Sequence, residues 1–456
     1  MIFYLETLGC PKNLVDAQGM ARLLKRQGHL SVDDPRQAQV LLVNTCGFIE
    51  DARDESIGEL RQLAADKRAD QVLIATGCLS QRWGEKLLEH VPGLDGLLGT
   101  RRWSEIEALV RQVQAGTGRR RGDLPALLDD PVTAIDADKE RFARQGASAY
   151  LKIAEGCSAP CAFCAIPLIK GPAASRSAEA IVQDAVELVQ AGSKEILLIA
   201  QDTTAYGRDR AEQDALPGLI QSILDAAPGP VARSESEPGQ GLHWLRLMYA
   251  YPGHIGPRLI EVMAGNPRVC HYLDLPLQHA HPDVLRRMKR PANVDRTRRL
   301  ITDLRAAMPD LALRTSFIVG YPGETEAEFE TLLDFVEEVR FDRLGVFFYS
   351  PEKGTAAEAL PDSVPEEVKI ERHDRLMALQ QQISMEINHA QVGRTLDVLV
   401  EGQGDGLSVG RSYRDAPEID GLVLLISDPS AATVGEMVSV RITGAMEYDL
   451  MGEVAQ

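Results

Sequence analysis

Short apolar runs alternate with amphipathic stretches over the first 115 residues of the chain. Ile2–Leu5, Val40–Val43 and Val72–Ala75 have the composition of buried strands, and apolar residues recur at helical spacing between them. Strands that alternate with helices predict a parallel sheet with helices on both faces. We therefore predict a doubly wound domain over residues 1–115, followed by a turn-rich linker over residues 116–146.

The same alternation resumes from residue 147 with longer units. Thr325, with Glu328 three residues later, predicts a capping box at the start of one helix. Six βα units predict an incomplete TIM-like (β/α)6 barrel, which with a trailing helix occupies residues 147–390. The candidate strands are Tyr150–Ile153, Ile196–Ala200, Leu245–Met248, Tyr272–Leu275, Leu313–Val319 and Leu344–Tyr349.

After residue 391 the pattern changes to short β-rich runs separated by Gly, Asp or Pro. Such runs predict a small antiparallel β-barrel over residues 391–456. The runs are Leu396–Val400, Val409–Tyr413, Leu422–Ile426 and Val438–Ile442. The fold class predicted for the whole chain is therefore α/β, with three domains.

Composition narrows the class of protein and the compartment. The 456 residues are enough for roughly three domains. Every apolar run is far shorter than the ~20 residues that span a bilayer, and the first residues do not resemble a secretory signal. Seven cysteines, an odd number, argue against a disulfide framework. We expect a cytoplasmic protein, without membrane contact, whose cysteines serve metal binding or catalysis.

Cys157, Cys161 and Cys164 follow the first strand of the predicted central barrel directly. Three thiolates at this spacing can hold three irons of a 4Fe–4S cubane and leave the fourth iron open. Zinc is the alternative, but it normally takes four tetrahedral ligands, and no nearby His completes the set. The spacing therefore favours an iron–sulfur cluster.

Cys10, Cys46 and Cys78 each come just after an apolar strand of the N-terminal domain. The carboxyl ends of parallel strands meet at one crevice, where ligands bind. We therefore expect a second site with three cysteines there. The alternative is that these small apolar thiols are buried by chance.

Other residues at strand ends give weaker signals. Gln201 and Asp202 follow the second strand of the barrel and are placed to bind a ligand, although a turn that caps the next helix explains them equally well. An open iron at a barrel mouth suits the generation of carbon radicals from S-adenosylmethionine, because no side-chain base can activate an ordinary C–H bond.

These motifs resemble a known family. The cysteine triplet resembles the signature of the radical-SAM superfamily, and three further cysteines with a trailing barrel resemble its methylthiotransferase family. Within that family the chain is similar to the type that modifies an aspartate β-carbon of ribosomal protein S-twelve. The resemblance is carried by LGCPKN (8–13), NTCGFI (44–49), TGC (76–78), AQDTTAYG (200–207), YLDLPLQH (272–279), VGYPGET (319–325) and GRSYRDAPEIDG (410–421).

The resemblance implies two 4Fe–4S clusters. Cys157, Cys161 and Cys164 would hold the cluster that cleaves S-adenosylmethionine, with Phe163 beside the adenine. An auxiliary cluster on the other three cysteines would carry the sulfur to be inserted. The implied partners are S-twelve, free or in the small ribosomal subunit, and a flavodoxin- or ferredoxin-like electron donor.

Charge bears on the choice of substrate. The chain has a net charge of −18, and residues 391–456 alone carry four Arg, no Lys and eleven Asp or Glu, a net −7. An acidic barrel suits a basic protein better than a nucleic acid, so nucleic-acid contact is expected to be secondary at most. Two alternatives remain, a methylthiotransferase acting on an adenosine of transfer RNA and a non-catalytic RNA-binding module that contains zinc.

Overall fold

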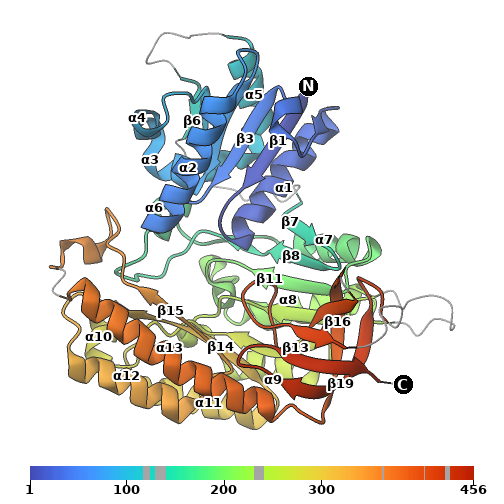
Figure 1. The fold of residues 1–456 in the computed structure, drawn as a ribbon, viewed down its shortest axis with the longest axis vertical. Helices are drawn as coiled ribbons and strands as arrows, with labels where there is room; N and C mark the ends of the chain where they lie inside the picture. Colours follow the sequence, from blue (N-terminus) through green and yellow to red (C-terminus); the bar gives the residue numbers. More distant parts are fainter. Residues whose placement is uncertain are drawn as a thin grey trace.

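The computed structural model describes residues 1–116, 124–128, 140–230, 241–361, 364–404, 406–426 and 432–455. These residues form a six-stranded sheet, a seven-stranded sheet and a closed five-stranded barrel, in that order along the chain, together with a small two-stranded sheet. Figure 1 shows the first sheet at the top, the second below it and the barrel at the lower right. In the described ranges, no helix combines the length and apolar character that crossing a membrane requires.

The N-terminal sheet is parallel and carries helices on both faces. Its strands are β1 (Ile2–Thr7), β2 (Leu30–Ser31), β3 (Val40–Thr45), β4 (Val72–Gly77), β5 (Gly96–Gly99) and β6 (Ala126–Leu127), and its helices are α1 (Pro11–Arg26), α2 (Glu50–Asp66), α3 (Cys78–Trp83), α4 (Leu87–His90) and α5 (Ile106–Gln114). The strand order is β2-β1-β3-β4-β5-β6. One apolar cluster contains side chains of α1 and α5, and a second contains side chains of α2, α3 and α4. The predicted doubly wound sheet is confirmed.

The central sheet contains the six predicted parallel strands. They are β8 (Ser148–Lys152), β11 (Glu195–Ile199), β12 (Trp244–Leu247), β13 (Val269–Asp274), β14 (Ala312–Val319) and β15 (Arg343–Phe348). They pair in the order β15-β14-β13-β12-β11-β8, and β15 stays an edge, so the barrel is incomplete as predicted. A further strand, β7 (Phe142–Gln145), pairs antiparallel with β8. Strand β7 lies within the predicted linker, and its half-polar sequence FARQ gave no strand signal.

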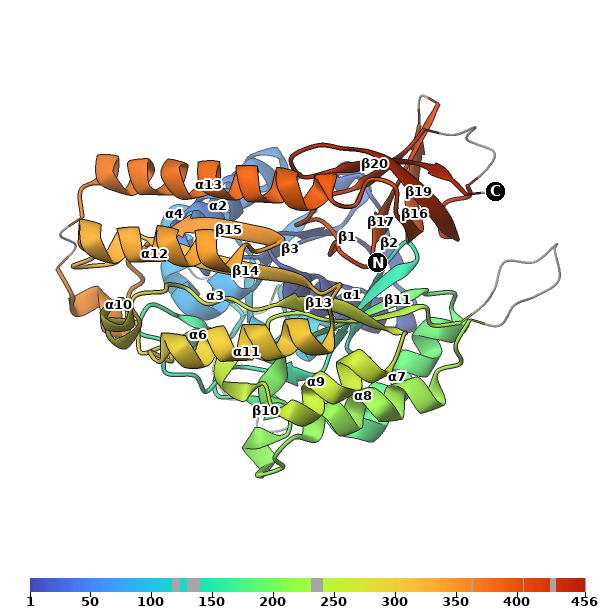
Figure 2. The ribbon, with the colours of Figure 1, turned by 90° about the horizontal axis from the view of Figure 1, so that it is seen from below.

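Helices line the outer side of the central sheet. They are α7 (Ala178–Gln190), α8 (Ala215–Ala226), α9 (Pro257–Gly265), α11 (Val294–Ala307) and α12 (Glu326–Val339), and Figure 2 shows the first four along one side of the strands. The largest apolar cluster of the chain lies between them and the sheet. Helix α12 begins with the predicted capping box, in which Thr325 and Glu328 each accept a hydrogen bond from the other's backbone N–H.

Shorter elements lie at the carboxyl ends of these strands. They are β9 (Ala154–Glu155), α6 (Ile166–Lys170), β10 (Ala174–Ser175), η4 (Thr203–Ala205) and α10 (Pro282–Arg287). After the central sheet, α13 (Glu366–His389) packs against β15 and α12 and leads into the C-terminal domain.

The C-terminal domain is the predicted small barrel. Its strands are β16 (Thr395–Gly404), β17 (Leu407–Ser412), β18 (Val423–Leu425), β19 (Met437–Ala445) and β20 (Leu450–Val454). They close in the order β16-β17-β18-β20-β19, and every pair is antiparallel except β18 with β20. Strand β20 was not among the predicted strands, because Gly452 and Glu453 interrupt its short apolar run.

Residues 411–420, which we call the floor segment, run from the end of β17 to the amino-terminal ends of the central strands. The Arg411 guanidinium is 2.7 Å from the carboxylate of Glu195, the first residue of β11. Asp415 is 2.6 Å from the guanidinium of Arg343, the first residue of β15. The floor segment therefore closes the end of the central barrel that lies opposite the cysteines.

Candidate active site

Cys157, Cys161 and Cys164, the barrel trio, lie in the loop between β9 and α6. At Gly156 the backbone φ is +66°, and a Cβ atom there would lie 2.0 Å from the carbonyl oxygen of Pro172, so only glycine fits. The Cys164 N–H donates to the Cys161 carbonyl at 3.2 Å. The loop thus folds back on itself, and its three thiols are close enough to influence one another electrostatically.

Cys10, Cys46 and Cys78, the N-terminal trio, follow three neighbouring strands. Cys10 precedes α1, Cys46 follows β3, and Cys78 is the first residue of α3. The backbone φ at Gly9 is +87°, and a Cβ atom there would lie 3.0 Å from the Cys46 sulfur. The three loops therefore meet at the carboxyl edge of the sheet, where Cys10 is exposed and Cys78 is buried.

A single buried side chain, Asn13, links these three loops. Its amide nitrogen donates to the carbonyls of Leu8 and Thr45, both at 3.0 Å. Its amide oxygen lies 3.4 Å from the Cys78 sulfur, and its backbone carbonyl accepts from the Asn44 side chain at 2.7 Å. Asn13 is therefore placed to fix the spacing of the N-terminal trio.

The two trios lie at one interface between domains. The Cys78 side chain packs with Ala165 and Ile169 in a small apolar cluster. Ala165 directly follows Cys164 in the chain. The N-terminal domain therefore presents its cysteines to the loop and helix that hold the barrel trio.

Burial favours the protonated form of the Cys78 and Cys164 thiols. It raises the pKa of Cys78 and that of Cys164 to about 12. The charge of Lys170 opposes this shift at Cys78, and the N–H of Ile166 and the charge of Arg290 oppose it at Cys164. A metal bound here must displace protons, so its affinity falls as the pH falls.

Four buried charged side chains and the half-buried Glu155 join the two domains next to the trios, with Asp16 of α1 at their centre. Lys152 Nζ and Lys170 Nζ lie 2.6 and 2.9 Å from its two carboxylate oxygens. Arg141 is 2.9 Å from Asp16, and Glu155 pairs with both Arg141 and Lys152. Burial alone would raise the pKa of Asp16, but the neighbouring cations hold it well below its ordinary value. The network therefore holds α1 against β8 and α6.

The spacing of the thiols does not suit a single zinc ion. Tetrahedral zinc with bonds of about 2.3 Å needs its sulfur ligands about 3.8 Å apart. Within the described ranges, only His281, Asp283 and Glu328 bring three ligand atoms within 4.8 Å of one another. All six cysteines are described, so neither trio has zinc spacing. A cubane binds each thiolate at a separate iron corner, so it does not require that close spacing.

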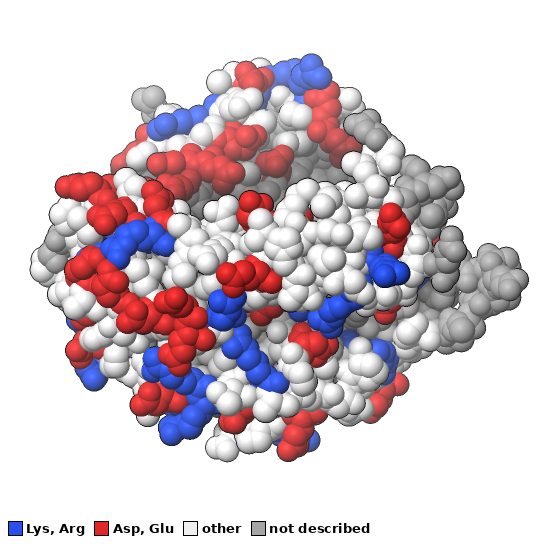
Figure 3. Space-filling view, turned by 60° about the horizontal axis from the view of Figure 1, so that its bottom comes forward, with Lys and Arg blue, Asp and Glu red and all other residues white. Residues whose placement is uncertain are grey.

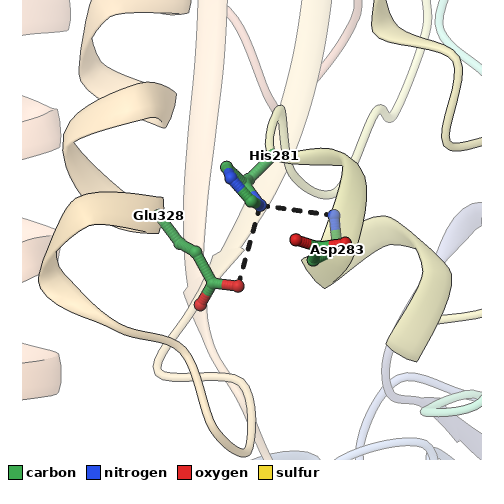
Figure 4. A group of neighbouring side chains, drawn as sticks. All are labelled: His281, Asp283 and Glu328. Carbon is green, nitrogen blue, oxygen red and sulfur yellow. Dashed lines mark hydrogen bonds and ion pairs between the residues drawn. The ribbon is translucent and has the colours of Figure 1, made fainter.

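The cluster of His281, Asp283 and Glu328 is explained by helix capping. His281 Nδ1 accepts from the Asp283 N–H at 3.2 Å and lies 3.6 Å from Glu328 (Figure 4). Both Glu328 carboxylate oxygens accept from the Arg287 guanidinium at 3.0 Å. The ring of His279 is buried, and its Nδ1 accepts from the His281 N–H.

The predicted cofactor residues lie near the barrel trio. Asp202 accepts from the Ala205 N–H at 3.1 Å, which caps η4, and pairs with His254 at 2.8 Å. These contacts are the ones expected if Asp202 caps the next helix. Gln201 and Phe163 are half-buried beside this loop and the cysteines, and a cofactor role for these residues stays a prediction.

Arg290 is a site residue that sequence reasoning missed. Its guanidinium is 3.7 Å from the Cys161 sulfur and lies 4.2 Å from the centre of the Tyr251 ring. No motif surrounds it, and it reaches the cysteines only through the fold. Arg290 brings a positive charge to the barrel trio.

Comparison with known proteins agrees with this architecture. The model of uncharacterized protein family UPF0004 matches residues 2–99, the radical SAM superfamily model matches residues 151–336, and the TRAM domain model matches residues 392–455. These three ranges fall on the N-terminal sheet, the central barrel and the C-terminal barrel.

Full-length relatives also match. The ribosomal protein uS12 methylthiotransferase RimO of Roseiflexus sp. strain RS-1 is 48% identical, over 100% of this chain and 98% of the relative. The protein of that name from Herpetosiphon aurantiacus is 45% identical over 100% of both chains. Among solved structures, the radical S-adenosylmethionine methyltransferase TsrM from Kitasatospora setae superposes with a TM-score of 0.56 at 13% identity, covering 90% of this chain and 77% of that one. This last likeness shows the fold alone.

Proposed function

The chain belongs to the RimO family of radical-SAM methylthiotransferases, and on this premise we propose that it inserts a methylthio group at the β-carbon of an aspartate of ribosomal protein uS12. One observation carries the proposal: the similarity to RimO relatives extends over the whole chain, so it spans the segments that contain both cysteine trios. A radical-SAM enzyme uses a 4Fe–4S cluster and S-adenosylmethionine. We assign that cluster to the barrel trio.

We assign a second 4Fe–4S cluster to the N-terminal trio. Its support is the convergence of three strand-end loops on Asn13 and the packing of Cys78 against the helix that follows Cys164. When bound, the two clusters and S-adenosylmethionine supply the radical and sulfur chemistry that side chains cannot perform.

Residues of this chain position and shield that chemistry. Arg290 donates toward the Cys161 sulfur, and Asn13 holds the three N-terminal loops together. Asp16 and Lys170 fix the two domains against each other, so the distance between the trios is set by buried contacts. Phe163, Gln201 and Asp202 are proposed to line the S-adenosylmethionine site. The barrel around them excludes water from a reactive radical.

The proposed partners follow from charge and chemistry. On the face drawn in Figure 3, acidic side chains gather over the left part, with Lys and Arg among them. In the C-terminal domain Asp415 is already paired with Arg343 of the central barrel. Asp397, Glu418 and Glu453 are exposed and available to a basic protein. We propose a flavodoxin- or ferredoxin-like electron donor. We also propose a cytoplasmic location, where the enzyme binds uS12 either free or in the small subunit.

The test is the intact mass of uS12 purified from cells with and without this gene. We expect a mass gain of one methylthio group on an aspartate, present only with the gene. Complementation with a chain in which Cys10, Cys46 and Cys78 are changed to alanine should leave uS12 unmodified. The matched control is Cys270→Ala, because Cys270 is buried away from both trios and should support normal modification. Unmodified uS12 beside altered transfer RNA would reject the proposal.

A further inference from the structure

Lys12 is a buried cation at the interface that holds the two trios. It keeps 7% of its surface accessible, and its Nζ lies 3.0 Å from the centre of the Tyr249 ring. Tyr249 follows β12 and has a backbone φ of +60°, which residues other than glycine rarely adopt. Its N–H donates to Asp274 at 3.1 Å, so the ring is held in place against the ammonium.

This ammonium has no anionic partner. Within the described ranges, no carboxylate lies within ion-pair distance of Lys12, and no hydrogen bond of its Nζ is present. Asp274, which acts on it electrostatically, is already paired with Arg314 at 2.8 Å. The Lys12 Nζ is not fully sealed from solvent, so a ligand can still reach the ammonium. A buried cation without an anionic partner favours the binding of an anionic ligand.

The position of Lys12 places such a ligand beside the N-terminal trio, where that domain meets the interior of the barrel. Lys12 stands two residues after Cys10, and its neighbours Leu14 and Val15 pack with Tyr249 in the cluster that fills the barrel interior. The adjacent network already holds three cations, Arg141, Lys152 and Lys170, for two carboxylates. In an acidic chain, this interface is a local region of positive charge.

We propose that Lys12 binds the side-chain carboxylate of the residue to be modified and so holds the neighbouring β-carbon at the mouth of the barrel. This inference rests on the proposed function, in which the target is an aspartate. A neutral target leaves a buried ammonium unpaired, so Lys12 also selects aspartate over asparagine.

The test measures binding of two versions of uS12, one with the target aspartate and one with asparagine in its place. The cluster-loaded wild-type enzyme should bind the aspartate version at least about thirtyfold more tightly. Lys12→Met should bind both versions alike, and Lys12→Arg, which keeps the charge, should retain the preference. Lys25→Met makes the same change at an exposed position of the same helix and should behave as wild type.

Two further measurements on the same variants distinguish the proposed role of Lys12 from other causes of a lost aspartate preference. S-adenosylmethionine binding and iron content should be unchanged in Lys12→Met. Weaker S-adenosylmethionine binding with the aspartate preference intact would assign Lys12 to the carboxylate of that cofactor and overturn the proposal. Iron loss in both Lys12 variants would overturn it too, because Lys12 would then support a cluster. If wild-type enzyme does not modify uS12, the proposed function itself fails; normal modification with an unchanged preference in Lys12→Met rejects only the role of Lys12.

Discussion

At the scale of residues, a few buried polar side chains define the site more sharply than the cysteines alone. The amide nitrogen and oxygen of Asn13 contact three different loops. A buried polar group with all its partners in place favours one arrangement of the chain around it.

We predict that Asn13→Ala prevents stable assembly of the auxiliary cluster. Removing the amide leaves the carbonyls of Leu8 and Thr45 without their donor, so the three loops lose their spacing. Iron should fall from about eight to about four atoms per chain, while the signal of the barrel cluster persists. Gln27→Ala, at the exposed end of the same helix, is the control. Full iron content in Asn13→Ala would contradict this role.

The place of the two cysteine trios at strand ends could be predicted, because strand ends are visible in the hydrophobic pattern. Their role as cluster ligands stays a prediction. Lys152, Lys170 and Arg290 could not be predicted in the same way. The two lysines act across the contact between two domains, and Arg290 reaches Cys161 from a distant point of the same domain. A linear pattern shows neither contact.

At the scale of elements, the length and composition of each strand decided whether it could be predicted from the sequence. The central strands were predicted because each combines several apolar residues with helical spacing on either side. Strands β5, β6, β7 and β20 were missed because they are short or half-polar and are held by pairing with a neighbour. The start of α12 could be predicted to the residue, because a capping box depends only on Thr325 and a residue three positions later.

We predict that Thr325→Ala lowers the free energy of unfolding by about 1 kcal/mol, because α12 loses its capping hydroxyl. Chemical denaturation measures the change. Thr331→Ala removes an exposed hydroxyl from the interior of the same helix, where alanine is favourable, and should not destabilise. A loss of equal size in both variants would argue against the cap.

At the scale of the whole molecule, the floor segment ties the last domain to the central barrel. Tyr272 of β13 donates to Asp420 at 2.7 Å, and Arg411 pairs with Glu195. The motif GRSYRDAPEIDG (410–421) is thus largely buried structure. Removing the C-terminal domain would open the barrel, so its role in docking is better tested by neutralising exposed acids than by deletion.

We predict that acid weakens this junction between pH 4.5 and about 2. Burial would raise the pKa of Glu195, but Arg411 and Arg246 lower it from 4.5 to about 2. Because the pKa is lower in the folded state, Glu195 contributes its full stabilisation above pH 4.5 and loses it as the pH falls toward 2. The loss is at most about 3 kcal/mol.

Urea unfolding of the cluster-free chain at several pH values measures this slope. Glu195→Gln cannot titrate, so its stability should depend less steeply on pH over that range, although it starts lower because two arginines lose their partner. Equal slopes in the two chains would show that other carboxylates control acid unfolding.

The floor segment also sets an order of events during synthesis. The last central strand is complete at Phe348, but residues 411–420 are translated roughly 3 to 15 seconds later at ordinary ribosomal speeds. Until then Glu195 lacks Arg411, one of its two arginine partners, and Arg343 lacks Asp415. We therefore expect metal delivery to succeed only on chains that have left the ribosome, with nascent chains a poor target for the iron-loading apparatus.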